Sequence, residues 1–257
     1  MTQRIVITRP AHQANLLVNG IKAAAGEVCL FPTLDISPVT LTPTDKQHLQ
    51  NINDYDIIIF ISPNAVEYGL KHIENASSIT DKTVLATIGK SSANQLAKRL
   101  GRLADIVPDS EFNSEGLLAT AAMKNVSDKN ILIVRGNAGR EHLKDSLQQR
   151  GAKVDYLSVY QRTQPDTSSA EIEQHLQNNQ IAAIVITSAT SLKNMLEMVP
   201  EKAHASLLKI PLVLINKRLS DVAESLGFAG PFYIASQASD EAIVAVLKKH
   251  KLLSVIE

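Results

Sequence analysis

Short, nearly continuous runs of Val, Ile and Leu alternate along the chain with longer amphipathic segments. Typical runs are 57–61 and 184–186. Because apolar residues fill these runs, both faces of each strand are expected to be covered, as in a parallel sheet. Alternation of such strands with helices predicts a doubly wound α/β fold. Four predicted helices stop just before a glycine, as helices commonly do: 14–25, 93–100, 143–150 and 220–226.

Four sequence blocks recur at one spacing. A strand-like block that starts at residue 4 pairs with one that starts at 130, which sets Arg9 against Arg135, 126 residues away. Blocks at 57 and 183 set Ser62 against Ser188 at the same offset. Two further pairs keep this offset at their matching ends, although one turn differs in length: 84–101 with 213–227, and 114–119 with 240–245. The chain is therefore expected to be an internal duplication.

Two segments rich in Pro, Thr, Ser and Asp interrupt the alternation, at about 35–45 and 158–170. They predict an inserted middle lobe at 40–159. The N-terminal piece is too short to form its own core, so residues 1–35 are expected to pack with 164–257 as a discontinuous outer lobe. The predicted fold is thus two doubly wound, parallel-sheet lobes of the Rossmann or flavodoxin type, joined by two crossing linker strands.

The residues directly after the predicted strands carry hydroxyl, amide, glycine and basic groups, without a carboxylate or a histidine among them. Ligands of open parallel sheets bind beyond the carboxyl ends of the strands, and helix starts offer N–H groups and partial positive charge. These features predict an anion-binding cleft between the lobes. The candidate binding residues are Arg9, Ser62, Asn64, Gly89, Lys90, Ser91, Ser92, Arg135, Gly136, Arg140, Thr187, Ser188, Lys217 and Arg218.

Several of these residues also have a plainer interpretation. Ser62 and Ser188 fit helix N-caps, although a capping serine can still face a ligand. Arg9 and Arg135 could close the sheet edges by pairing with nearby acids. Tyr160 lies in the second linker, where its phenol either packs between the lobes or acts in the cleft as a hydrogen-bond donor or weak general acid.

Charge and motifs narrow the function classes. Lys plus Arg and Asp plus Glu both number 26, so no global field favours nucleic acid or an anionic membrane. The segment 136–140 lacks the glycine spacing of a nucleotide-binding loop. The histidines lack metal-ligand spacing, so we expect no metal site. The single cysteine, Cys29, lies in an apolar run and is expected to be a small buried side chain, in keeping with a reducing compartment.

Targeting signals are not expected. Arg4, Arg9 and Pro10 fall where a signal peptide would need an unbroken apolar stretch. No segment approaches the roughly 18 apolar residues of a membrane helix. We therefore expect a cytoplasmic protein that is neither exported nor embedded in a membrane.

Taken in order, these segments resemble the uroporphyrinogen-III synthase family over nearly the whole chain. No single motif is diagnostic, but their order and spacing together are fairly specific. The segments are TRP at 8–10, FISPNAV at 60–66, the glycine turn and helix at 88–101, SEGLL at 114–118, 131–154 followed by VYQR at 159–162, and VITSATSLKNML at 185–196.

This resemblance implies a cyclising lyase that closes the linear hydroxymethylbilane to uroporphyrinogen III, with inversion of the last pyrrole ring and loss of water. It implies an azafulvene cation, a spiro intermediate and no cofactor. The acetate and propionate groups of such a substrate would need the anion-binding edge predicted above. The resemblance further implies a monomer, and we expect a transient contact with the enzyme that produces hydroxymethylbilane.

Site residues carried over from the family fall on Ser62, Ser92, Tyr160 and Ser188, with Tyr160 as the candidate for assisting departure of the hydroxyl. The segment 215–220 departs from the family pattern. Its expected glycine falls on Asn216, so the usual contact of that turn is in doubt, and Lys217 or Arg218 is expected to substitute.

Two other classes of protein fit the same composition. One is a two-lobed binding protein that closes on a small anion without chemistry. The other is an enzyme of the glycosyltransferase type with two Rossmann-like lobes, against which the missing acidic partner for a metal or ribose argues.

Overall fold

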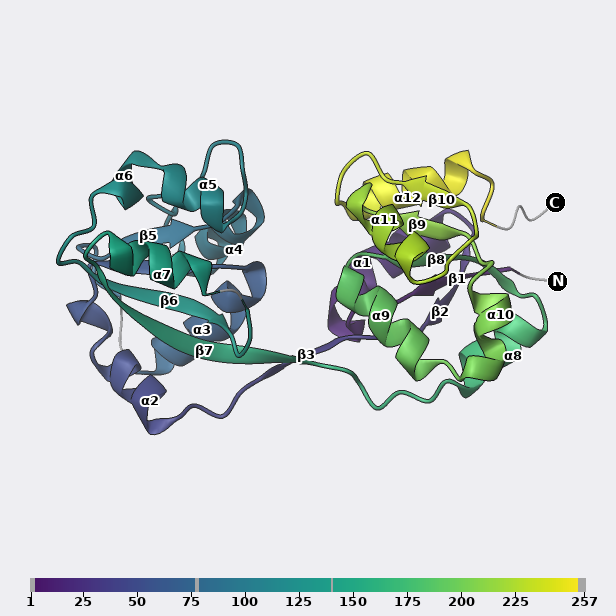
Figure 1. The fold of residues 1–257 in the computed structure, drawn as a ribbon, viewed down its shortest axis with the longest axis horizontal. Helices are drawn as coiled ribbons and strands as arrows, with labels where there is room; N and C mark the ends of the chain where they lie inside the picture. The colour runs from purple at the N-terminus through teal and green to yellow at the C-terminus, as the bar shows by residue number, and fades with distance from the viewer. Residues whose placement is uncertain (1–2, 77–78, 140, 254–257) are drawn as a thin grey trace. The chain divides into compact units, whose positions relative to one another are not determined.

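The chain forms two compact units, seen in a computed structural model that describes residues 3–76, 79–139 and 141–253 (Figure 1). Unit 1 consists of Met1–Asp35 and Thr163–Glu257, and unit 2 of Ile36–Arg162. Each unit contains one five-stranded sheet. The four strand pairs of the unit 1 sheet and three of the four pairs of the unit 2 sheet are parallel. The predicted α/β class with two mostly parallel sheets is confirmed.

Unit 1 has the strand order β10-β9-β8-β1-β2. Its first segment contributes β1 to the interior of the sheet and β2 to its edge, so the sheet needs both segments of the chain. The elements of unit 1 are β1 (Arg4–Ile7), α1 (Ala11–Ala23), β2 (Glu27–Leu30), α8 (Ala170–Gln177), β8 (Ile181–Ile186), α9 (Ala189–Met198), η2 (Glu201–Ala203), α10 (His204–Leu207), β9 (Leu212–Leu214), α11 (Arg218–Ser225), β10 (Phe232–Ile234) and α12 (Asp240–Lys249).

Unit 2 has the strand order β3-β7-β6-β4-β5. The segments expected to be linkers are partly regular, because β3 occupies the start of the first and β7 runs into the second. The elements of unit 2 are β3 (Asp35–Pro38), α2 (Pro43–Gln50), η1 (Ile52–Asp54), β4 (Ile57–Phe60), α3 (Pro63–Ala76), β5 (Val84–Thr87), α4 (Lys90–Leu100), α5 (Ser114–Ala119), α6 (Ala121–Lys124), β6 (Asn130–Gly136), α7 (His142–Gln149) and β7 (Lys153–Thr163).

The duplication reappears in the strand register. In unit 1 β1 pairs with β8 through Ile5 and Ala183, and in unit 2 β6 pairs with β4 through Ile131 and Ile57. Each of these residues lies 126 positions from its counterpart, and the β1–β2 pairing recurs between β6 and β7 at the same offset. The order β9-β8-β1-β2 therefore matches β5-β4-β6-β7, while β10 and β3 extend opposite ends of the two sheets.

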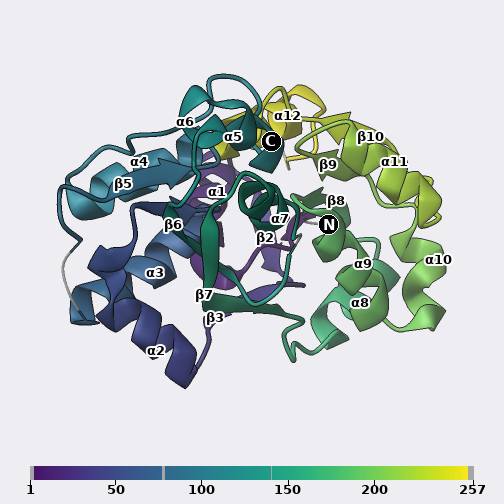
Figure 2. The same ribbon diagram turned by 60° about the vertical axis from the view of Figure 1, so that its left-hand side comes forward.

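Helices cover both faces of each sheet, which explains the continuous apolar runs. In unit 1, α8, α9 and α11 pack on one face and α1 and α12 on the other, as Figure 2 shows. In unit 2, α2, α3 and α4 cover one face and α5 and α7 the other. The core side chains of β4 alternate between the two faces, with Ile58 and Phe60 on one and Ile57 and Ile59 on the other.

At three of the four helices that were predicted to end before a glycine, that glycine follows the helix in the left-handed conformation. Gly101, Gly151 and Gly227 follow α4, α7 and α11 with positive φ, where a glycine has no Cβ to clash. After α1 the left-handed residue is Ala25, with φ of 61°, and not Gly26. Gly26 is required for a different reason, since a Cβ there would lie 2.7 Å from Ile21 Cγ2. Among the described residues, every helix is too short or too polar to cross a membrane.

Candidate functional site

Ser62 and Tyr160 meet where the strands of unit 2 reach their carboxyl ends, which we call the carboxyl edge. Ser62 follows β4, and its Oγ accepts a hydrogen bond of 3.0 Å from the backbone N–H of Ala65 in the first turn of α3. The predicted N-cap is thus present. The same Oγ lies 3.1 Å from Tyr160 Oη. One serine hydroxyl therefore caps the N-terminus of α3 and also contacts the Tyr160 phenol.

Tyr160 is a residue of β7 and not of an irregular linker, and it is only 3% exposed. Its ring packs in the unit 2 core with residues of α3 and β4, which corrects the expectation that Tyr160 belongs to a linker. Next to it on β6, Gly136 has no room for a side chain, because a Cβ there would lie 2.8 Å from Tyr160 Cε2. Gly136 therefore makes space for the ring.

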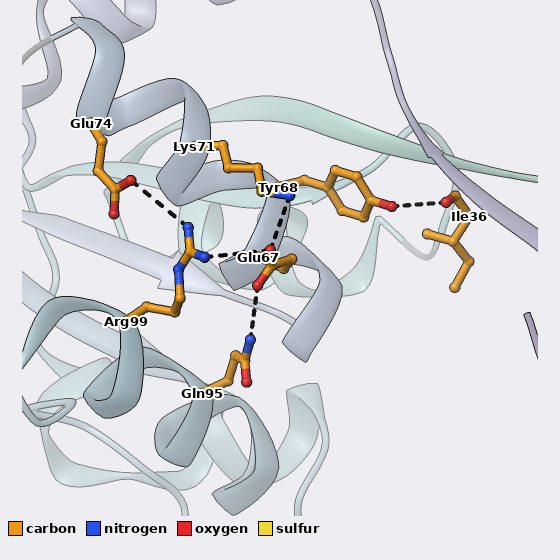
Figure 3. A network of polar contacts seen from close by, with 7 residues as sticks. All are labelled: Ile36, Glu67, Tyr68, Lys71, Glu74, Gln95 and Arg99. Atoms are coloured by element: carbon orange, nitrogen blue, oxygen red, sulfur yellow. Dashed lines mark hydrogen bonds and ion pairs between the residues drawn. The ribbon is translucent and has the colours of Figure 1, made fainter. Parts of the chain in front are cut away.

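Two further side chains surround the Tyr160 ring, and the sequence did not single them out. Tyr68 of α3 lies with its ring centroid 6.0 Å from that of Tyr160. Its hydroxyl donates to the carbonyl of Ile36 at 2.8 Å, so it also joins α3 to β3 (Figure 3). Arg162 places Nη2 3.4 Å from Tyr160 Oη, and its guanidinium lies 5.7 Å from the ring centroid. An exposed cation thus lies beside the phenol.

Arg135 does not face outward as expected of an anion ligand. It is 5% exposed, Nη1 donates to Glu141 Oε1 at 3.0 Å, and the guanidinium lies 4.3 Å from the Tyr156 ring centroid. The neighbouring Tyr156 hydroxyl and then Arg135 lower the pKa of Glu141 below its ordinary value. Burial, followed by the Glu141 carboxylate, raises the pKa of Tyr156 to about 12. Arg135 therefore follows the plainer interpretation, in which it pairs with a nearby acid.

The predicted ligands in the turn that begins α4 differ in their exposure to solvent. Gly89 is the N-cap and offers no capping side chain, which leaves the first N–H groups of the helix available to an anion. Lys90 and Ser91 are exposed, and Lys90 Nζ lies 5.3 Å from the Phe112 ring centroid. Ser92 is only 3% exposed. Its side chain is therefore buried, in contrast to those of Lys90 and Ser91.

Unit 1 repeats the serine cap without the tyrosine. Ser188 follows β8, and its Oγ accepts a 3.0 Å hydrogen bond from the N–H of Ser191 at the start of α9, as predicted for an N-cap. Its neighbour is a second hydroxyl, Ser191 Oγ at 2.8 Å. Thr187 and Asn64, the remaining polar candidates beside these two caps, are both half-buried.

Arg9 resembles Arg135 in being paired. Its guanidinium forms an ion pair with the carboxylate of Asp240, the first residue of α12. The two acids at the carboxyl edges, Asp240 and Glu141, are the nearby acids of the pairing interpretation given for Arg9 and Arg135. Both start a helix rather than follow a strand directly, which is why strand ends alone did not reveal them.

The divergent turn 215–220 has its own capping residue. Asn216 Oδ1 accepts a 3.1 Å hydrogen bond from the N–H of Leu219. The asparagine thus stabilises the start of α11 with its side chain, which the expected glycine could not do. Lys217 and Arg218 are exposed at this helix start. The remaining candidate, Arg140, lies outside the described residues.

One group of metal-ligating side chains occurs away from these positions. Cys29, Glu171 and His175 of unit 1 place their ligand atoms within 4.8 Å of one another. No such group was expected from the sequence, because Cys29 is far along the chain from the other two.

Comparisons with known proteins agree with one another. A family model described as Uroporphyrinogen-III synthase HemD matches residues 16–245. The uroporphyrinogen-III synthase of Escherichia coli K12 is 27% identical over 247 residues, which are 95% of this chain and 99% of that protein. That of Proteus mirabilis is 30% identical over 178 residues, or 69% of this chain and 89% of that protein.

Solved structures support the fold. A mutant uroporphyrinogen III synthase from Thermus thermophilus superposes with a TM-score of 0.64 at 15% identity, covering 97% of this chain and 98% of that one. The Helicobacter pylori 26695 synthetase gives 0.60 at 16% identity, covering 97% and 100%. Since the family model spans most of the sequence and both terminal segments of unit 1 contribute to the match, the chain belongs to the uroporphyrinogen-III synthase family.

Proposed function

We propose that this chain, as a cyclising lyase of tetrapyrrole biosynthesis, closes hydroxymethylbilane to uroporphyrinogen III with inversion of the last ring and loss of water. The family match over residues 16–245 is the observation that carries the proposal. The chemistry asks the protein mainly to hold a flexible ligand in the geometry that leads to inversion, because unguided closure gives the other isomer. Positioning can supply a large part of such a rate difference.

The acetate and propionate groups of the substrate need donors of hydrogen bonds and positive charge. The start of α4 supports such a role in unit 2, since Gly89 leaves N–H groups uncapped and Lys90 is exposed. The start of α11 supports it in unit 1 through exposed Lys217 and Arg218. Arg9 and Arg135, which are already paired with carboxylates, act instead by fixing the backbone around these edges.

The pair of Tyr160 and Ser62 supplies the polar group for the departing hydroxyl. Tyr160 Oη has Ser62 Oγ at 3.1 Å and Arg162 Nη2 at 3.4 Å. Arg162 can donate to the phenol oxygen, which leaves the phenol proton to be donated outward. A hydrogen bond to the leaving hydroxyl lowers the barrier to forming the cation, and the buried ring keeps the donor in one orientation.

We further propose that the enzyme uses no cofactor and acts as a monomer in the cytoplasm. It makes a short-lived contact with the enzyme that produces hydroxymethylbilane. Ring closure with loss of water involves no net oxidation or reduction, so the reaction does not require a redox group. An unstable, freely cyclising substrate favours direct handover between the two enzymes.

The test is a product-isomer assay. Freshly made hydroxymethylbilane is incubated with the purified chain, the products are oxidised, and the type I and type III porphyrins are separated chromatographically. We expect mainly type III with the protein and type I without it. Type I alone in both samples would overturn the proposal, and ligand binding without type III product would make the chain a binding protein.

A further inference from the structure

Three side chains with metal-ligating atoms converge where β2 meets α8 in unit 1. Cys29 lies on β2, and Glu171 and His175 lie one turn apart on α8. Cys29 Sγ is 3.8 Å from Glu171 Oε1, and His175 Nε2 is 3.5 Å from the same oxygen. Cys29 is 2% and His175 9% exposed, whereas the Glu171 side chain is largely open to solvent.

The unusual member of this cluster is His175. Its Nε2 is buried without a hydrogen-bond partner among the described residues, an arrangement that ordinarily carries a free-energy cost. Its Nδ1 lies 3.0 Å from Gln180 Oε1. Since an amide oxygen only accepts, Nδ1 donates this hydrogen bond, and in the neutral imidazole Nε2 then presents a lone pair toward Cys29 and Glu171. Metal-binding histidines are commonly oriented by this kind of second contact.

The spacing of the atoms fits a small tetrahedral ion. Typical zinc–ligand distances with tetrahedral angles put a thiolate sulfur about 3.6 Å from a carboxylate oxygen, and an imidazole nitrogen about 3.4 Å from it. The observed separations of 3.8 and 3.5 Å are close to both values. The third pair, Cys29 Sγ and His175 Nε2, lies within 4.8 Å, where a shared ion needs about 3.6 Å. These two side chains would therefore have to approach each other by at most about 1.2 Å.

Charge also favours a divalent ion. A metal-bound thiol is deprotonated, so binding of M²⁺ releases one proton to solvent. One thiolate, one carboxylate and one neutral imidazole around the ion then form a group without net charge.

We propose that Cys29 Sγ, Glu171 Oε1 and His175 Nε2 form a zinc-binding site in unit 1, with water in the fourth position on the exposed side of Glu171. Sulfur and imidazole ligands favour zinc over magnesium or calcium. The ion would join β2, from the N-terminal segment of the chain, to α8, from the C-terminal segment. None of the three ligands belongs to the proposed substrate-binding set, so the role of the site is to stabilise unit 1.

The test uses the full chain, reduced and stripped of metal with a chelator. Titration with Zn²⁺ is expected to give one ion per chain and release of about one proton, measured calorimetrically in buffers of different ionisation enthalpy. Titration with Co²⁺ should produce a thiolate-to-cobalt charge-transfer band in the near ultraviolet. Because this band reports sulfur ligation in the unaltered chain, its absence would overturn the proposal whatever the variants do.

Variants then assign the ligands. Cys29→Ser should abolish the cobalt band and His175→Gln should weaken zinc binding, whereas His12→Asn, an exposed histidine of the same unit, should leave both unchanged. Gln180→Leu keeps all three ligands but removes the partner of Nδ1, and should weaken zinc binding about 10- to 100-fold. Unchanged binding in a folded Cys29→Ser chain would overturn the site. Zinc binding is measured without substrate, so the result is independent of the proposed cyclisation.

Discussion

Tyr160 combines a buried ring with a hydroxyl that has two polar neighbours. The ring is fixed by the core of unit 2 and by the absence of a side chain at Gly136. The hydroxyl contacts Ser62, which is itself fixed by capping α3. The ring and its partner Ser62 are therefore held by interactions that do not involve the substrate, which is the arrangement expected of a preorganised donor.

Replacing Tyr160 by Phe removes the donor and keeps the ring. A hydrogen bond to a group that develops charge contributes about 1.5–3 kcal/mol, so we expect kcat for type III product to fall about 10- to 100-fold with KM little changed. Steady-state kinetics and thermal unfolding check this. Tyr233→Phe, in β10 where the ring stacks on His250, is the matched control. Full activity of Tyr160→Phe would remove this phenol from the mechanism.

Adding a methyl group at Gly136 tests the same packing from the other side. The Cβ would lie within 2.9 Å of two ring atoms of Tyr160, so Gly136→Ala should lower the free energy of unfolding by about 1–3 kcal/mol. The loss should be smaller in a Tyr160→Leu background, because the clash is with the ring. Denaturant unfolding of the four chains measures this coupling, and an equal loss in both backgrounds would contradict it.

For single residues, the sequence predicted the helix caps but not the contacts between distant side chains. Ser62 and Ser188 could be recognised as caps because a cap depends on the next three residues. The acid that pairs with Arg9 and the cluster at Cys29 could not be recognised, since Asp240 is 231 residues from Arg9 and Glu171 is 142 from Cys29. Such contacts depend on which strands become neighbours.

Helices α3 and α4 are connected by a carboxylate that several donors share. Glu67 of α3 lies 3.0 Å from Lys71 Nζ and 3.0 Å from Gln95 Nε2 of α4 (Figure 3). Arg99 of α4 approaches Glu67 at 3.6 Å and Glu74 at 3.8 Å. Burial raises the pKa of Glu67, but Lys71, Arg99 and Gln95 outweigh it, and the net shift is downward.

A lowered pKa in the folded state means that ionised Glu67 stabilises the fold above its unfolded pKa, near 4.5, and that this contribution disappears as the pH falls through the folded value. Glu67→Gln should therefore destabilise the chain at pH 7, by about 1 kcal/mol or less for so exposed a network. The difference from the unaltered chain should shrink below about pH 4.5. Urea unfolding across this pH range measures it.

The control for Glu67 is Glu224→Gln, on the exposed side of α11. A difference between Glu67→Gln and the unaltered chain that stays constant down to pH 3, or that grows on acidification, would contradict the role of the ionised carboxylate. Loss of the hydrogen bond from Gln95 alone would give such a constant difference.

Elements were more predictable than their ends. Continuous apolar runs identified β4 and β8 because they are buried on both faces. The helix α1 ends with left-handed Ala25, which sequence preference does not favour, since tertiary packing around Gly26 and Ile21 decides that turn. The two linkers were predicted as irregular by their Pro and Thr content, yet β3 and β7 form there by pairing with each other.

Across the whole molecule the two copies keep their topology and differ in chemistry. The register of corresponding strands is conserved at 126 residues. The serine caps correspond as well, but their hydroxyl neighbours differ. In unit 2 the capping serine contacts Tyr160, whereas in unit 1 Ser188 contacts another serine. The two copies therefore offer different polar groups at corresponding positions.

Binding of a substrate with many carboxylates should depend on salt although the chain has no net charge. Raising ionic strength screens exposed lysines and arginines, so KM should rise with salt while kcat changes little. The double variant Lys217→Gln, Arg218→Gln should raise KM at low salt and flatten its salt dependence. Lys248→Gln, Lys249→Gln, which removes two exposed cations from the end of α12, should not. Equal effects of both pairs would contradict binding at α11.

The position of β1 between β2 and β8 has a consequence for synthesis on the ribosome. The segment that carries β1 leaves the ribosome well before its neighbour β8, which follows only after residues 8–180 have been made. At 5–20 residues per second this delay is roughly 9 to 35 s. Unit 2, which is continuous, can fold during that time, while the apolar β1 strand must wait with one side unpaired. The nascent chain is thus open to aggregation and to chaperones at the segment that carries β1, long after those residues have been translated.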